Sequence, residues 1–243
     1  MQIKIALCVE KVVKYLVISM VFFAIVSTGI QLAKYVFNFD SEWLDLFNLD
    51  RELNLPTWYS AFMIGFCAIL LRIIAIGKKQ QGDRYTKDWK LLSTIFCLMA
   101  IDEVISLHEI FIIPEVSEAL NLPWFLHSMW VIPGSLFVIW FLRRYSRFVK
   151  HLPTKSKQRF MLAAGIYISG ALVMEMIGSH FAESIGQQHL TYALIATVEE
   201  ILEMTGIIVF IHSLLYYLSQ WNNQLRLQID VLDTSLGSLQ SRR

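Results

Sequence analysis

The chain alternates between long apolar stretches and short polar segments. Six of the stretches are long enough, or nearly so, to cross a bilayer, because about 20 mostly apolar residues are needed to span a hydrocarbon core of about 30 Å. They cover residues 15–37, 56–77, 91–113, 124–142, 160–181 and 191–218. Lipid cannot hydrogen-bond exposed backbone groups, so each stretch is expected to be helical.

The pattern therefore predicts an all-α polytopic membrane protein. We expect six transmembrane helices within residues 1–218 and a short cytoplasmic tail over residues 219–243. The fourth stretch contains Pro133-Gly134, which predicts a kink or break in that helix.

Basic residues indicate how the helices are oriented. The polar segments 78–90 and 143–159 are rich in Lys and Arg, whereas segments 114–123 and 182–190 contain none. Of the 21 Lys and Arg residues, only Lys34 and Arg51 fall on the opposite side from the rest. Because cytoplasmic loops carry the excess of basic residues, we expect both termini inside and a location in the inner (plasma) membrane.

The overall composition indicates that the lipid bilayer is a partner and that nucleic acid is not expected to be one. Hydrophobic residues make up 56% of the chain, and the net charge is only +1. The three cysteines, Cys8, Cys67 and Cys97, have no paired spacing, so neither a disulfide framework nor a zinc ribbon is indicated.

The most informative residues are seven acids within three of the apolar stretches, none of which contains Lys or Arg. A charged acid in the middle of a bilayer costs about 2.5 kcal/mol or more, so such residues usually face the interior of a bundle and mark a functional site. These residues are Asp102, Glu103, Glu109, Glu175, Glu199, Glu200 and Glu203.

The acids are expected to lie at comparable depths, in the middle-to-outer half of the membrane. At about 1.5 Å per residue, Glu103 lies about 17–18 Å from the inner end of its helix, and Glu175 about 22 Å. Two stretches also share a Glu-x₄-His pattern, at Glu103–His108 and Glu175–His180. Because an i,i+5 step turns an ideal helix by about 140°, both groups would reach one ion only across a π-bulge or a break.

The leading hypothesis is a metal-dependent enzyme, a hydrolase or an oxidoreductase, acting on a membrane-soluble substrate. Carboxylates together with imidazoles suit a divalent Zn, Fe or Mn ion. Asp102 and Glu109 are candidates for catalytic general bases. The candidate metal ligands are Glu103, His108, Glu175, His180, Glu199, Glu200 and Glu203.

Two other functions stay open. Acids stepped through a helical bundle are also typical of proton relays, which indicates a proton- or cation-coupled transporter or channel. A structural or sensory membrane subunit is the third hypothesis, with the acids satisfied by the basic residues of a membrane partner. A homo-oligomer also stays open. The substrate is accordingly expected to be lipid-like or an ion.

Overall fold

The computed structural model describes residues 8–107, 123–126 and 128–221, and this part of the chain contains helices and no strand. The all-α prediction is confirmed for these residues. Its helices follow the apolar pattern closely, and the elements are α1 (Val9–Phe37), η1 (Leu44–Phe47), α2 (Leu55–Gln80), α3 (Thr86–Ile105), η3 (Trp124–Leu126), α5 (Val131–His151), α6 (Thr154–Ile168), η4 (Ser169–Met174), α7 (Glu175–Ile185) and α8 (Leu190–Ser219).

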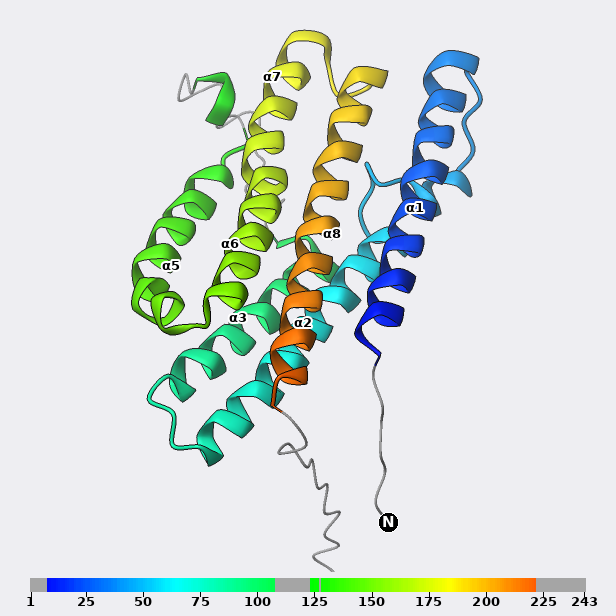
Figure 1. The fold of residues 1–243 in the computed structure, drawn as a ribbon. Coiled ribbons are helices and arrows are strands. Elements are labelled where there is room, and N and C mark those ends of the chain that lie inside the picture. The colour runs from blue at the N-terminus through cyan, green and yellow to red at the C-terminus, as the bar shows by residue number, and fades with distance from the viewer. Residues whose placement is uncertain (1–7, 108–122, 127, 222–243) are drawn as a thin grey trace, which may run out of the picture.

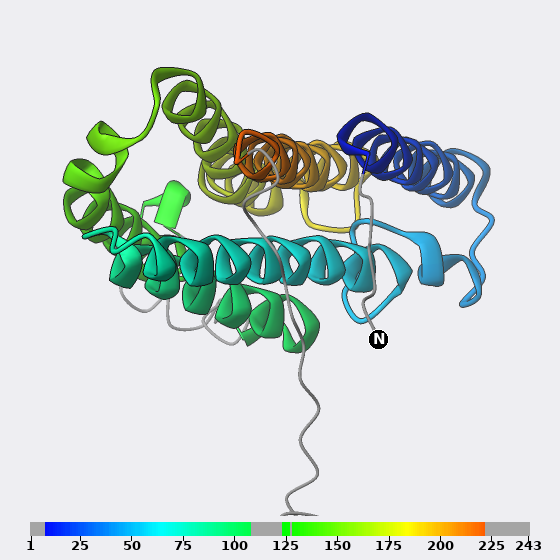
Figure 2. The ribbon, with the colours of Figure 1, turned by 60° about the horizontal axis from the view of Figure 1, so that its bottom comes forward.

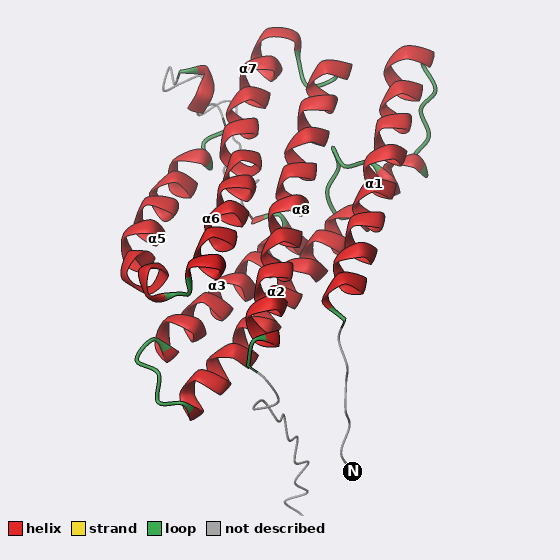
Figure 3. Cartoon of the chain, in the orientation of Figure 1, coloured by secondary structure: helices red, strands yellow, loops and turns green. Residues whose placement is uncertain are grey.

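The helices form two layers, with α8 at the centre of the larger one. Figures 1 and 2 show α8 between α1 and the continuous rod formed by α6, η4 and α7, while α2 and α3 pair in the layer beneath. Figure 3 shows the same arrangement, with the connection between α1 and α2 reaching down to the middle of the bundle, where α2 begins. The short connection over residues 81–85 lets α2 and α3 pack side by side, and residues 186–189 do the same for α7 and α8.

The core lies where α2, α3 and α8 meet. Met63, Ile74, Trp89, Met204 and Leu214 are all at most 1% exposed. By contrast, many large apolar side chains point outward, as expected of surfaces that face lipid rather than water.

Three helical segments are long and apolar enough to cross a membrane: Val9–Phe37, Leu55–Gln80 and Thr154–Ile185. These segments are consistent with a membrane protein. The count of six spans and the placement of the termini stay predictions.

Charge separates the two ends of the bundle. We define the basic end by the connections α2–α3 and α5–α6, which carry the Lys- and Arg-rich segments, and the acidic end by the connections α1–α2 and α7–α8 (Figure 1). At the basic end, Arg144 Nη1 donates to Asp88 Oδ1 at 2.6 Å, and Tyr145 Oη donates to the backbone oxygen of Asp88 at 3.1 Å.

Two local predictions differ from the structure. The kink at Pro133-Gly134 is wrong, because α5 begins at Val131 and places Pro133 in its first turn, where a missing N–H breaks no helical hydrogen bond. The third helix also ends earlier than expected, at Ile105, and the next residue, Ser106, adopts a left-handed conformation with φ of 48°.

Candidate functional site

Two glutamates from different helices meet inside the bundle. Glu175 is the first residue of α7, Glu199 lies on the third turn of α8, and their carboxyl groups are within hydrogen-bonding reach of each other. A carboxylate can only accept hydrogen bonds, so a bond between two carboxyl groups requires a proton held between them. Glu203 and Glu200 are the other acids that act on Glu199.

Glu200 joins this pair to a second set of acids. Its strongest electrostatic neighbours are all acidic: Glu203 on its own helix, Glu103 on α3, and Glu52 and Asp50 in the segment before α2. Because like charges this close repel one another strongly where water is excluded, the set cannot be fully ionised without compensation. The arrangement therefore extends from the acidic end of the bundle inward along α8.

Tyr167 adds one more polar group beside these acids. Its side chain hydrogen-bonds with Glu203, and Glu103 and Glu200 also act on it. We name these residues the carboxyl cluster: Asp50, Glu52, Glu103, Tyr167, Glu175, Glu199, Glu200 and Glu203.

Two glycines let α6 and η4 approach α8 closely enough to form the cluster. A Cβ added at Gly206 would lie 2.7 Å from the backbone nitrogen of Tyr167, and one at Gly170 would lie 2.8 Å from the backbone oxygen of Glu199. Any larger residue would therefore push the helices apart at the level of the acids. Small residues serve the same purpose in other membrane bundles, where they allow backbones to touch.

The rod that carries Glu175 contains a π-helix, η4, which ends immediately before this glutamate. A π-turn holds more residues than an α-turn, so it changes the direction in which the following side chains leave the helix. Such turns are rare in proteins and are frequently found at functional sites. Here the π-helix sets how Glu175 is rotated relative to Tyr167.

The segment between α1 and α2 is fixed by a buried polar network. Gln31 Nε2 donates to Thr197 Oγ1 at 2.9 Å and to Asn48 Oδ1 at 3.2 Å, and the Leu49 amide donates to Ser27 Oγ at 2.9 Å. Gln31 and Ser27 are fully buried. This network ties the segment to both α1 and α8, about one turn from Glu200.

Ser106 connects the end of α3 to the same segment. Its Oγ donates to Glu52 Oε2 at 3.1 Å, which is possible because its left-handed backbone conformation ends the helix there. Asp102 and Glu103, one turn earlier, are half-buried, and both interact with other groups.

Between the cluster and the basic end, aromatic rings pack together in the bundle. Phe210, two turns after Glu203, packs against Phe96 and Phe160 with ring centroids 4.9 and 5.0 Å away, and Trp89 contacts Phe160 at 6.2 Å. The polar line is thus bounded toward the basic end by a packed apolar layer.

Residues 12–218 match the family described as Domain of unknown function (DUF8692). The chain belongs to this family. The matched region begins in α1 and ends in α8, so the whole carboxyl cluster lies within it. No curated protein and no solved structure matches the chain.

The predicted metal site is wrong for the part of the chain that the structure describes. Among those residues, no group of three or more His, Cys, Asp or Glu side chains is placed to hold a metal ion. The prediction of a bound Zn, Fe or Mn ion is therefore overturned, and so is the metal-dependent enzyme built on it. The family description assigns no activity in its place.

The physical reason lies in where the predicted ligands point. The carboxyl groups of Glu175 and Glu199 lie within hydrogen-bonding reach of each other, and they do not converge with a third ligand on a common point. His180 is exposed and packs on the ring of Trp124 at 4.9 Å, because α7 is a regular helix that turns it away from Glu175. The remaining candidates, His108 and Glu109, lie outside the described residues, and the catalytic role of Asp102 stays a prediction.

Sequence reasoning missed Tyr167, Asp50 and Glu52 as neighbours of the acids. Tyr167 carried a weak signal, a phenol within an apolar stretch, about two turns before Glu175. The two loop acids carried none, since a surface loop is an ordinary place for a carboxylate.

Proposed function

We propose that this chain is a six-helix integral membrane protein whose carboxyl cluster binds and releases protons. The single observation that carries the proposal is the pair formed by Glu175 and Glu199, whose mutual hydrogen bond needs a proton. Ionisable residues inside membrane bundles generally belong to ion or proton pathways, which supports a functional rather than a structural pair.

Proton exchange is proposed to occur from the acidic end only. Asp50 and Glu52 lie between α1 and α2 at that end and act on Glu200, which gives protons a line of carboxyl groups to follow. In the opposite direction, the rings of Phe96, Phe160 and Phe210 pack on one another with centroids 4.9 and 5.0 Å apart, which puts an apolar layer between the cluster and the basic end. A site that exchanges protons with one side only is better suited to a membrane protein that senses pH than to a channel.

The distribution of Lys and Arg places the acidic end outside the cell in this proposal, with both termini inside. Protons would then be taken from the outer solution. Binding of a proton would relieve repulsion between α3, α7 and α8, because the acids that approach one another come from these three helices and from the loop before α2.

The proposal is tested by reconstituting the full chain in liposomes. A pH indicator outside the vesicles measures proton uptake after a pH jump, and a second indicator inside measures sustained flux. We expect reversible uptake that is reduced in Glu199→Gln and Glu200→Gln, with no sustained flux into the lumen. Glu42→Gln is the matched control, because Glu42 is an exposed acid at the same end of the bundle.

Two results would contradict the proposal. Sustained flux that is lost in Glu199→Gln would show that protons cross the protein, which is the transporter hypothesis. Equal uptake by the original chain, by Glu199→Gln and by Glu200→Gln would show that the cluster does not exchange protons over the pH range of the jump.

A further inference from the structure

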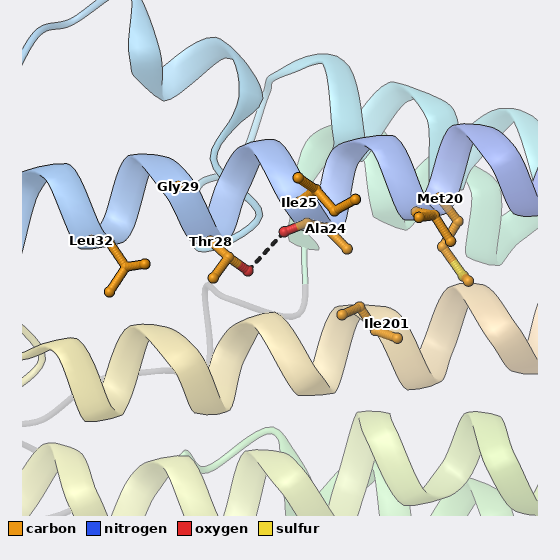
Figure 4. Close-up of a pocket in the computed structure, with 8 residues that line it drawn as sticks. Met20, Ala24, Ile25, Thr28, Gly29, Leu32 and Ile201 are labelled. Atoms are coloured by element: carbon orange, nitrogen blue, oxygen red, sulfur yellow. Dashed lines mark hydrogen bonds between the residues drawn. The ribbon is translucent and has the colours of Figure 1, made fainter.

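Two apolar hollows lie along the seam between α1 and α8, and we call them together the α1–α8 groove. One hollow of about 490 Å³ is lined by residues from Met20 to Leu32 of α1 and by Ile201, and a second of about 320 Å³ is lined by Val13, Val17 and Met20 together with α8. Figure 4 shows Met20, Thr28 and Leu32 on α1 above Ile201 on α8. Met20 lines both hollows, so they adjoin along the seam.

The size and shape of the groove suit an extended apolar chain. From Val13 to Leu32 the helix rises about 28 Å, close to the thickness of the hydrocarbon core. Each hollow has a volume within the range of small-molecule sites, about 300–1,000 Å³. The groove stays open because small residues, Ala24, Thr28 and Gly29, line the α1 side, and a Cβ at Gly29 would meet nothing within 4 Å.

Positive charge lies at the basic end of the same groove. Lys14 precedes Val17 and Val21 by three and seven residues, so it shares their face of α1, and Lys11 lies one turn before it. Both lysines are exposed, and neither forms an ion pair with another of the described residues. Glu10 in the first turn offsets one of the two charges.

A second cation lies close to the same end. His212 lines the groove on α8, and Arg159 of α6 is near enough to interact with it electrostatically. The guanidinium of Arg159 lies 4.0 Å from the ring centroid of Tyr216, and its Nη1 is buried with no hydrogen-bond partner among the described residues.

We propose that the α1–α8 groove binds one phospholipid with an anionic headgroup. An acyl chain of this lipid lies along the groove, and its phosphate lies at the basic end near Lys14 and His212. This site is separate from the carboxyl cluster and does not depend on its function. The charge at the groove's end favours a lipid over a second copy of this chain, whose own α1 would bring the same lysines against these.

Native mass spectrometry of the full chain tests the proposal. The purified protein is offered phosphatidylglycerol or phosphatidylcholine in detergent, and the retained lipid is counted. We expect one phosphatidylglycerol to be retained in preference to phosphatidylcholine. Val17→Trp, which fills the groove, should lose it, whereas Ile18→Trp should not, because Ile18 is equally on the surface of α1 but does not line the groove.

The headgroup is tested by charge. Lys14→Gln should weaken phosphatidylglycerol retention about fivefold, the change that corresponds to about 1 kcal/mol per lysine near an anionic lipid. Lys87→Gln, an exposed lysine at the same end on α3, should leave it unchanged.

Three outcomes would overturn the proposal. The first is equal retention of lipid in Val17→Trp and Ile18→Trp, and the second is equal retention of the two lipids by the original chain. The third is a change of oligomeric mass in Val17→Trp, since that result would assign the groove to a second copy of the chain.

Discussion

An acid within an apolar bundle must find a cation, a metal ion, water or a proton. Glu175 and Glu199 lie within hydrogen-bonding reach of each other, and in the proposed function a shared proton satisfies both. The desolvation cost that made the acids stand out in the sequence is general, and it predicted only that they face the interior of the bundle. It did not distinguish between a metal ion and a proton as the compensation, because that choice depends on side-chain direction.

Asp50 belongs to the cluster but lies outside the expected membrane spans. We expect its contribution to the stability of the fold to depend on pH. Burial raises the pKa of its carboxyl from 3.8 to about 6, against the opposing effects of Arg51 and Lys34. A raised pKa favours the protonated form in the folded state, so its contribution to stability is present below about pH 4 and is lost as pH rises through 6.

We therefore expect Asp50→Asn to stabilise the fold at pH 8 and to have almost no effect at pH 4. The full shift corresponds to about 3 kcal/mol, and partial exposure of the side chain reduces the expected gain to about 1–2 kcal/mol. Thermal unfolding in detergent at the two pH values measures it. A variant that is less stable than the original chain at pH 8 would contradict the account of this residue.

Asp83, at the basic end, differs from Asp50 because the pKa of its carboxyl is lowered and not raised. Burial acts to raise the pKa of Asp83, but the Tyr85 amide, which donates at 2.8 Å, and the Lys78 ammonium at 3.2 Å together hold it below its usual value. The stability it contributes is present at neutral pH and is lost as pH falls through this lowered pKa.

Replacing Asp83 with Asn should therefore cost about 1–2 kcal/mol at pH 7, because a half-buried ion pair and a charge-assisted hydrogen bond are weakened. The difference between variant and original chain should shrink as the pH is lowered below 4. Chemical unfolding across this range, with Glu42→Gln as an exposed control, checks the prediction. An effect that does not depend on pH would show that the charge of Asp83 is not the cause.

At the scale of the elements, the apolar pattern predicted α2, α6 to α7 and α8 to within a few residues. It failed at α5, where Pro133 fits the first turn rather than a kink, since proline is tolerated at either place and the sequence does not choose between them. It also gave no sign of the π-helix at Ser169–Met174, which depends on how closely α8 approaches.

The close approach of α6 and α8 gives a test of the packing. Gly206→Ala should destabilise the bundle by about 1–3 kcal/mol, because the new methyl group would collide with the Tyr167 backbone. Gly165→Ala is the matched control on α6, since a Cβ there meets nothing within 4 Å. This control should gain about 0.5–1 kcal/mol from helix propensity.

Thermal unfolding of the two glycine variants in the same detergent compares them directly. If Gly206→Ala is as stable as Gly165→Ala, the helices do not approach as closely as the structure indicates.

At the scale of the whole molecule, the proposed side of proton exchange depends on which end of the bundle faces the cytoplasm. The structure places Gln80 and Lys155 near the basic end and Gln187 near the acidic end (Figure 1). The distribution of Lys and Arg predicts that the basic end faces the cytoplasm. Topology reporters fused at Gln80 and Lys155 should therefore report the inside, and one at Gln187 the outside, and any reversal would contradict the proposed side of proton exchange.

The central claim is that Glu175 and Glu199 share a proton within the bundle, and infrared spectroscopy of the purified full chain tests it most directly. We predict an absorption of protonated carboxyl groups at neutral pH that loses the same intensity in Glu175→Gln and in Glu199→Gln, with no further loss in the double variant, while Glu42→Gln leaves it unchanged. If the original chain shows no protonated carboxyl absorption at neutral pH, or if neither glutamine variant alters it, the account is contradicted.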